Sequence, residues 1–210
     1  MKRSVFVIPM LIVATALFAQ TATVREFSGR VEYRLSATDA WTAVRAGLQI
    51  PLNATVSTGF NSRAVLVVNS SVIDVAALTR LTIEELAADA SGTSTAVFVP
   101  VGRVRATVDR DARLSTDFRV RTAQSTAAVR GTSFETNGWQ LSVSEGIVEF
   151  ANLLGQSRTI GATEISVITD DGPTDPLDEA NNQANLGDAD FPDGQLPTGP
   201  AGFITVRWGN

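Results

Sequence analysis

Short runs in which apolar and polar residues alternate recur along most of the chain, and this pattern constrains its fold more than any other feature. In the first run, residues 26–36, the apolar side chains of Val31, Tyr33 and Leu35 alternate with charged and hydroxyl side chains. A period of two places one face of a strand in a core and the other in solvent. Later runs are rich in Val, Thr and Ile and are separated by Gly, Asn, Asp or Ser: Ala64 to Val68, Val72 to Val75, Thr95 to Val101, Arg103 to Val108, Asp117 to Thr122, Trp139 to Val143 and Glu164 to Ile168. The pattern predicts an all-β domain, which we place at residues 23–169.

One stretch, from Leu78 to Ala90, is compatible with either type of secondary structure. Its first part, to Ile83, continues the strand pattern. Thr82 and Glu85 have the spacing of a capping box, in which a hydroxyl and a carboxylate close the first turn of a helix. We therefore expect a strand from Leu78 to Ile83, and a short helical turn is an alternative for the residues after it.

Residues 1–22 have the organisation of a secretory signal peptide. Basic residues precede an apolar run from Val5 to Phe18, and Ala19 and Ala22 supply small residues after it. An uncleaved membrane anchor is the alternative, but it needs about 20 apolar residues, and this run is shorter and contains Pro9. Because the chain has no Cys, we exclude a lipid anchor at the cleavage point. We expect a periplasmic or secreted protein that does not span the membrane after cleavage.

The chain lacks several of the side-chain types on which enzymes commonly depend, so its chemistry is limited to carboxylates, hydroxyls, Arg and one Tyr. It has no Cys and no His, and its only Lys is Lys2, in the expected signal peptide. Thiol nucleophiles, imidazole bases, Schiff-base lysines and the usual zinc sites are therefore excluded. We expect no catalytic residue, no metal and no cofactor. A glycan hydrolase with two carboxylates is an alternative, but aromatic residues are only 7% of the chain, and we expect Trp41 and Trp139 to pack in the core.

The charge of the chain is unevenly distributed. Residues 24–169 contain 14 Arg and 14 acids, whereas residues 170–193 contain eight acids and no base. The neutral body gives no sign of a nucleic-acid binder. A segment rich in Asp, Asn, Gly and Pro buries too little apolar surface to order itself. We therefore expect an irregular acidic linker or loop at 170–202, followed at 203–210 by a strand that pairs with a sheet edge or docks on a partner.

Four arginines form a candidate binding patch. Arg103 and Arg105 share one face of a predicted strand, and so do Arg119 and Arg121. If these two strands pair as a hairpin, the four guanidinium groups lie on one outer face, where they can bind an anionic glycan, a phosphate-bearing polymer or the acidic tail. The alternative is a solvated face whose charge is offset by neighbouring acids: Asp109, Asp111 and Asp117.

Several motifs follow one another in a recognisable order. They begin with Trp41, Val44 and Gly47 and continue through Thr55 to Gly59, Ser62 to Leu66, Val120 to Thr122, Ala127 to Phe134 and Val143 to Val148. In order and spacing they resemble the FecR-domain family over about Val24 to Phe150. The most diagnostic pair is Val-Arg-Gly-Thr-x-Phe followed by Glu-Gly-x-Val, which places motif residues at Arg130, Gly131, Thr132, Phe134, Glu145 and Gly146.

The motif residues are expected to be structural, and ligand binding is the alternative. A glycine inside a β-prone run, such as Gly131, indicates a bulge or a close approach of two backbone segments. Arg130 beside it can pair with a nearby carboxylate such as Glu145.

The resemblance implies an extracytoplasmic β domain, built as a twisted, solenoid-like or sandwich-like stack of short strands. The best-known members of the family are inner-membrane regulators. They receive a signal from an outer-membrane transporter and control a sigma factor through a cytoplasmic N-terminal domain. Few residues precede the apolar run here, so we expect the domain without the segment that holds a sigma factor.

These observations together predict a non-catalytic, extracytoplasmic binding or interaction module of the bacterial cell envelope, with envelope signalling as one possible role. Its expected partner is an envelope protein or an anionic envelope polymer. A structural surface protein that assembles through its C-terminal tail and strand is the main alternative, and the glycan hydrolase is the third.

Overall fold

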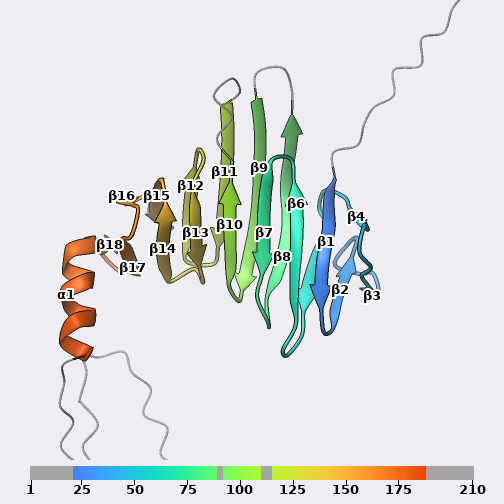
Figure 1. Cartoon of the computed structure of the whole chain (residues 1–210), viewed down its shortest axis with the longest axis horizontal. Helices are drawn as coiled ribbons and strands as arrows, with labels where there is room; N and C mark the ends of the chain where they lie inside the picture. The colour runs from blue at the N-terminus through green and yellow to red at the C-terminus, as the bar shows by residue number, and fades with distance from the viewer. Residues whose placement is uncertain (1–20, 89–91, 110–114, 188–210) are drawn as a thin grey trace, which may run out of the picture.

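The computed structural model describes residues 21–88, 92–109 and 115–187, which form two open, stacked β-sheets and one helix (Figure 1). Sheet A contains, in spatial order, β18 (Gly172–Pro173), β17 (Ile165–Thr169), β14 (Gln140–Glu145), β13 (Ser133–Thr136), β10 (Val104–Val108), β7 (Ser71–Val75), β6 (Arg63–Val68), β1 (Ala22–Ser28) and β4 (Gln49–Ile50). Sheet B contains β16 (Ser157–Gly161), β15 (Ile147–Asn152), β12 (Ser125–Val129), β11 (Ser115–Thr122), β9 (Gly92–Val101), β8 (Arg80–Ala88), β5 (Thr55–Thr58), β2 (Val31–Arg34) and β3 (Thr42–Ala43). The predicted all-β, sandwich-like fold is confirmed.

The chain alternates between the two sheets as it advances along the long axis of the sandwich. Hairpins such as β6–β7 and β13–β14 lie in sheet A, and hairpins such as β8–β9 and β11–β12 lie in sheet B. Strand β10 crosses alone into sheet A, so that β9 and β11 become neighbours in sheet B and pair in parallel. The other strand pairs of the described residues are antiparallel.

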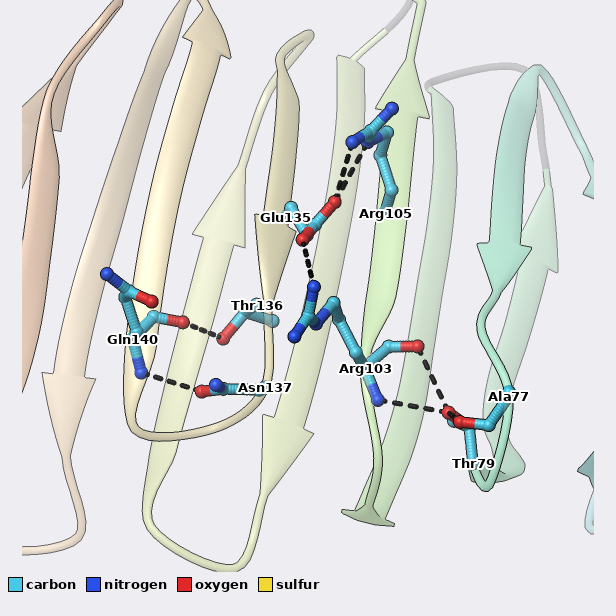
Figure 2. A network of polar contacts seen from close by, with 8 residues as sticks. All are labelled: Ala77, Thr79, Arg103, Arg105, Glu135, Thr136, Asn137 and Gln140. Atoms are coloured by element: carbon cyan, nitrogen blue, oxygen red, sulfur yellow. Dashed lines mark hydrogen bonds and ion pairs between the residues drawn. The ribbon is translucent and has the colours of Figure 1, made fainter. Parts of the chain in front are cut away.

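The crossings between sheets are tight corners that stack on one another. Gly102, between β9 and β10, has a φ of 102°, a region that residues with a Cβ rarely adopt. A Cβ there would lie 2.5 Å from Thr79 Cα and 2.6 Å from Thr79 Cβ, in the corner between β7 and β8. The Thr79 hydroxyl accepts a hydrogen bond from the Arg103 amide at 3.0 Å and lies 3.2 Å from the carbonyls of Arg103 and Ala77 (Figure 2). Two neighbouring corners are therefore joined by a glycine and a hydroxyl.

Two other corners repeat this arrangement. A Cβ at Gly29 would collide with the Ser62 hydroxyl, and a Cβ at Gly146 would lie 2.8 Å from Thr132 Oγ1. In both corners the hydroxyl bonds the backbone of the residue that follows the glycine. Glycine and a small hydroxyl residue thus recur as a pair where one corner rests on the next.

The core lies between the two sheets and consists of the inward-facing side chains of both. The largest fully buried residues include Phe118 of β11, Phe134 of β13 and Phe150 of β15. The rings of Phe118 and Phe134 meet edge to face, with centroids 6.5 Å apart and planes at 70°. This geometry is favourable for aromatic pairs, and since the two strands belong to different sheets, the contact ties sheet A to sheet B.

The helical turn considered after Ile83 does not form. Strand β8 continues to Ala88 and pairs with β9 as far as Thr93, with a register shift between Ile83 and Glu85. The Thr82 hydroxyl bonds the Thr55 hydroxyl at 2.9 Å instead of capping a helix. Pairing with strands on both sides has overridden the local capping signal, as tertiary contacts commonly do.

The expectation that Trp139 packs in the core is wrong. It lies in the turn between β13 and β14 and is 56% exposed. The Asn137 carboxamide oxygen accepts hydrogen bonds from the backbone amides of Trp139 at 3.0 Å and Gln140 at 2.9 Å, and this turn directs the indole outward. Trp41 is half-buried, and the Arg34 guanidinium lies over its ring at 4.6 Å from the centroid.

The acidic segment that begins at residue 170 is not irregular throughout. Strand β18 pairs with β17, and helix α1 (Pro176–Gly187) follows. Asp175 caps this helix by accepting a hydrogen bond from the Leu177 amide at 3.1 Å, Pro176 occupies its first position, and two acids stand in its first turn. These are favourable helix-start features that composition alone concealed. The predictions for residues 1–20, 188–202 and 203–210 lie outside the described residues.

In the part of the chain that the structure describes, no helix has the length and apolar character needed to cross a bilayer.

Replacing Asp175 by Ala is expected to destabilise α1 by about 1 kcal/mol, because the first-turn amide loses its acceptor. Hydrogen exchange measures this change: amides of α1 should exchange faster while those of the sheets keep their protection. Asp171→Ala, which removes an exposed acid from the turn before β18, is the matched control. Equal exchange in the two variants would show that Asp175 does not hold the helix start.

Candidate interaction surface

A row of alternating charges crosses the outer face of sheet A. Arg105 on β10 lies between Asp74 on β7 and Glu135 on β13, directly opposite each in the strand register. Side chains that follow one another across a sheet face interact when they carry opposite charge. The register therefore builds a charged stripe from three neighbouring strands.

Glu135 holds two arginines at once (Figure 2). Its carboxylate accepts hydrogen bonds from Arg105 Nη2 at 2.7 Å and Arg105 Nε at 3.1 Å, and from Arg103 Nη1 at 3.3 Å. Arg103 and Arg105 stand two residues apart on β10, so their side chains share the outer face. One carboxylate thus fixes the direction of two guanidinium groups.

Arg63 on β6 forms the other end of this charged stripe. Its Nε donates to Asp74 Oδ1 at 2.7 Å, and its Nη2 donates to Asp74 Oδ2, so the pair is bidentate. The hydrogen bond to Asp74, together with the charge of that carboxylate, raises the pKa of Arg63 above its usual value. Arg63 therefore stays positive at any pH at which the protein is studied.

Between these ion pairs the sheet carries an open depression of about 340 Å³. We call the charged set around it the sheet A site: Arg63, Asp74, Arg103, Arg105 and Glu135. The three arginines keep more than half of their side-chain surface in solvent. Exposed ion pairs of this kind contribute at most about 1 kcal/mol each, so a ligand that supplies its own anionic groups can replace the internal carboxylates at low cost.

The four-arginine face predicted from the sequence does not form. Strand β10 pairs with β7 and β13 in sheet A, whereas β11 pairs with β9 and β12 in sheet B. Arg119 and Arg121 therefore lie in the other sheet from Arg103 and Arg105. The hairpin assumption failed because the chain changes sheets between these two strands.

In sheet B the remaining two arginines have partners of their own. Arg119 pairs with Asp117 on the same strand, and Arg121 Nη1 donates to Glu84 Oε2 of β8 at 2.7 Å. The Arg121 guanidinium also lies over the Phe98 ring, 5.9 Å from its centroid. Asp117 thus neutralises the charge of Arg119. This agrees with the alternative prediction of a solvated face whose charge is offset by neighbouring acids.

Three residues of the sheet A site were missed in the sequence. Arg63, Asp74 and Glu135 come from three strands that are up to 72 residues apart along the chain. Each occupies an outward position of an alternating run, so the sequence places each on an outer face. Which strands are neighbours was not readable from periodicity, and only strand order brings them together.

The motif residues gather at two stacked corners. Gly131, with a φ of 92°, lies between β12 and β13, and Thr132 is buried with its hydroxyl donating to the Ile147 carbonyl at 2.9 Å. Gly146 lies in the adjoining corner, between β14 and β15. Phe134 is in the core, while Arg130 and Glu145 are exposed. A contact between those two charged residues stays a prediction.

The charged side chains of the sheet A site form ion pairs with one another. No three carboxylates, imidazoles or thiols of residues 21–88, 92–109 and 115–187 come together as a metal-binding group. What the sheet A site presents is a set of oriented guanidinium groups, which recognise carboxylates and phosphates through paired hydrogen bonds.

A family model described as FecR protein matches residues 54–149. Over these residues the chain is similar to the FecR family. The matched region spans β5 to β15 and includes the stacked corners at Gly102, Gly131 and Gly146. The matched residues also include every residue of the sheet A site.

Some solved structures are similar to part of the chain, while no curated protein matches it. Two crystal structures of a "putative anti-sigma factor" from Parabacteroides distasonis, at 1.65 Å and 2.50 Å resolution, are similar to the chain. They share 21% and 20% sequence identity with it, at TM-scores of 0.47 and 0.45. Each match covers 55% of this chain and 55% of the solved chain, so the chain spans about half the length of these structures.

Proposed function

We propose that this protein is a non-catalytic binding module of the bacterial cell envelope, which acts outside the cytoplasm in envelope signalling. It binds an acidic protein partner through the sheet A site. The observation that carries this proposal is the arrangement of Arg63, Arg103 and Arg105, whose guanidinium groups are held by two carboxylates yet remain largely exposed.

The ion pairs prepare these arginines for a ligand. A long side chain that is already oriented loses less conformational entropy on binding. Carboxylates of a partner can then exchange with Asp74 and Glu135, which keep the free site nearly neutral. Small ligands prefer enclosed, mostly apolar cavities, whereas this site is open and charged, which favours a protein surface as the partner.

The composition supports a role without catalysis. Outside residue 2 the chain has no Lys, and it has no His or Cys anywhere, so thiol nucleophiles, imidazole bases and Schiff-base lysines are missing. The carboxylates of the sheet A site are both engaged by arginine. Binding is the function that these groups can perform at neutral pH.

An export test addresses the cellular location. The pattern of residues 1–22 predicts processing near Ala22. Expression in a Gram-negative host, followed by fractionation and N-terminal sequencing, should give a shortened protein in the periplasm or medium. A full-length protein in the cytosol would contradict the proposed location.

Binding to an acidic partner is tested with immobilised polyglutamate as the probe. Arg103→Glu together with Arg105→Glu should lower retention at least about tenfold, since several charge-assisted hydrogen bonds become repulsive. Arg119→Glu together with Arg121→Glu makes the same change of charge in sheet B and should have a much smaller effect. Glu135→Gln keeps an oxygen that can accept a hydrogen bond from Arg103 or Arg105 but removes the competing negative charge, so it should strengthen retention. Equal losses in the two double variants would contradict the sheet A site as the binding surface.

A further inference from the structure

One end of the sandwich carries a row of exposed apolar side chains. Strands β1, β5, β7, β9, β11, β13 and β15 all run toward this end, because their neighbours are antiparallel and β9 is parallel to β11. The turns that follow them meet at the lower end in Figure 1. We call these segments the lower rim: residues 29–30, 59–62, 76–80, 101–103, 122–125, 137–140 and 152–156.

The lower rim exposes more apolar surface than a solvated set of turns needs. Its large apolar residues protrude to the following extents: Phe60 81%, Leu78 51%, Val101 54%, Trp139 56%, Leu153 70% and Leu154 80%. Large apolar side chains that are exposed together at one end of a domain indicate a site of contact with a protein or a membrane. The depressions described on the two sheet faces are lined by other residues.

The charges of the lower rim have one sign. Its seven segments contain Arg30, Arg80 and Arg103 and no acid. The nearest carboxylates belong to the strands, where Glu32 pairs with Arg30 and Glu135 pairs with Arg103. The next turn, between β17 and β18, contains Asp170 and Asp171 and marks where the rim ends. Basic and apolar side chains without acids are complementary to an anionic lipid surface.

Several backbone amides in the turns of the lower rim already have hydrogen-bond acceptors within the protein. The Asn152 carboxamide oxygen accepts hydrogen bonds from the amides of Leu154 and Gln156, both at 3.0 Å. Asn137 does the same for the turn that carries Trp139. A backbone amide that already has an acceptor loses less when water is removed. The tips with the most exposed leucines and the tryptophan therefore bring few unpaired polar groups toward lipid.

We propose that the lower rim rests on the surface of an anionic lipid bilayer, with Phe60, Trp139, Leu153 and Leu154 in the interfacial region. A bilayer is deformable and accepts a row of separate tips, and tryptophan favours its interface. In this orientation both sheet faces stand away from the lipid. The sheet A site then stays accessible to a partner, so membrane contact adds to the proposed function without replacing it.

The test is flotation of the full processed protein with vesicles of phosphatidylethanolamine and phosphatidylglycerol. The triple variant Phe60→Ser, Leu153→Ser and Leu154→Ser should bind at least about tenfold more weakly, because each buried apolar side chain contributes to partitioning. The matched control, Leu35→Ser, Leu52→Ser and Ile147→Ser, changes exposed apolar residues at the opposite end and should float like the parent protein. All variants share one N-terminus, so that segment cannot cause a difference between them.

Tryptophan fluorescence provides an independent measurement. In a Trp41→Phe and Trp208→Phe background, emission comes from Trp139 alone. Its emission should shift to shorter wavelength when anionic vesicles are added, and the shift should be smaller with phosphatidylcholine vesicles. Thermal unfolding of each variant near the parent temperature shows that the fold is retained, and the Leu153→Ser, Leu154→Ser double variant replaces the triple if the triple unfolds.

Other occupants of the rim give different results. A parent protein that fails to float overturns the proposal, as does equal loss of flotation in the rim triple variant and the control triple. A dimer in light scattering that the rim triple variant dissociates, without vesicle binding, would assign the rim to a second copy of the chain. Binding to polyglutamate is measured separately, so failure here leaves the sheet A site standing.

Discussion

Gly102→Ala should destabilise the protein by about 3 kcal/mol or more. The new methyl group would press against the backbone of Thr79, with Cα at 2.5 Å, and the backbone would keep a φ of 102°. The neighbouring corner cannot withdraw easily, because the Thr79 hydroxyl is bonded to the Arg103 amide. Urea unfolding followed by circular dichroism measures the change in the free energy of unfolding.

Gly47→Ala separates the two causes of this effect. Gly47 has a φ of 78°, but a Cβ there would meet nothing within 4 Å. Its substitution should therefore cost only the backbone strain, about 1–2 kcal/mol. If the two variants lose the same stability, contact between stacked corners is not what makes Gly102 necessary.

Phe134→Ala should lower the free energy of unfolding by about 3–5 kcal/mol, because it leaves a cavity between the sheets. The side chain is fully buried and meets Phe118 edge to face. Phe60→Ala removes the same atoms from a ring that is 81% exposed and should change stability by less than about 0.5 kcal/mol. Chemical unfolding of the two variants provides the comparison.

A double-mutant cycle tests whether Phe118 and Phe134 act as a pair. Their coupling should be about 0.5–1.5 kcal/mol beyond the burial of each ring. If Phe134→Ala prevents folding, Phe134→Leu in the same cycle keeps the measurement possible. A loss below about 1 kcal/mol for Phe134→Ala would contradict a core shared by both sheets.

Periodicity predicted the strands but not their neighbours. The alternation of polar and apolar residues at Arg103 to Val108 and at Asp117 to Thr122 depends only on the local sequence. It correctly predicted the strands β10 and β11. The partner of each strand depends on long-range packing, which alternation does not encode. The hairpin that the arginine patch required does not form for this reason, and the arginines lie in two different sheets.

The candidate site was predicted in part for the same reason. Arg103 and Arg105 were recognised because they share one strand. Glu135 orients these two arginines, and Asp74 lies on the other side of Arg105. Both acids belong to strands that are far from β10 in the sequence and become its neighbours only in the folded sheet. The exposed position of Trp139 likewise depends on an Asn137 turn that interrupts the strand pattern.

Helix α1 shows the opposite case, in which local signals were present but composition outweighed them. Asp175 and Pro176 are a favourable cap and first residue, and acids follow in the first turn. The high content of Asp, Asn and Gly after Thr169 had suggested an irregular segment. Whether the start of this segment forms a helix depends more on the capping residue Asp175 and on Pro176 than on the average composition of the segment.

Site-specific photocrosslinking in intact cells tests the proposed binding role most directly. A photoreactive residue is placed at Thr107, exposed on β10 of sheet A, or at Thr159, exposed on β16 of sheet B. The account predicts one discrete protein adduct from Thr107 that disappears when Arg103→Glu and Arg105→Glu are introduced, and no such adduct from Thr159. Absence of an adduct at Thr107, or the same adduct from both positions, would contradict it.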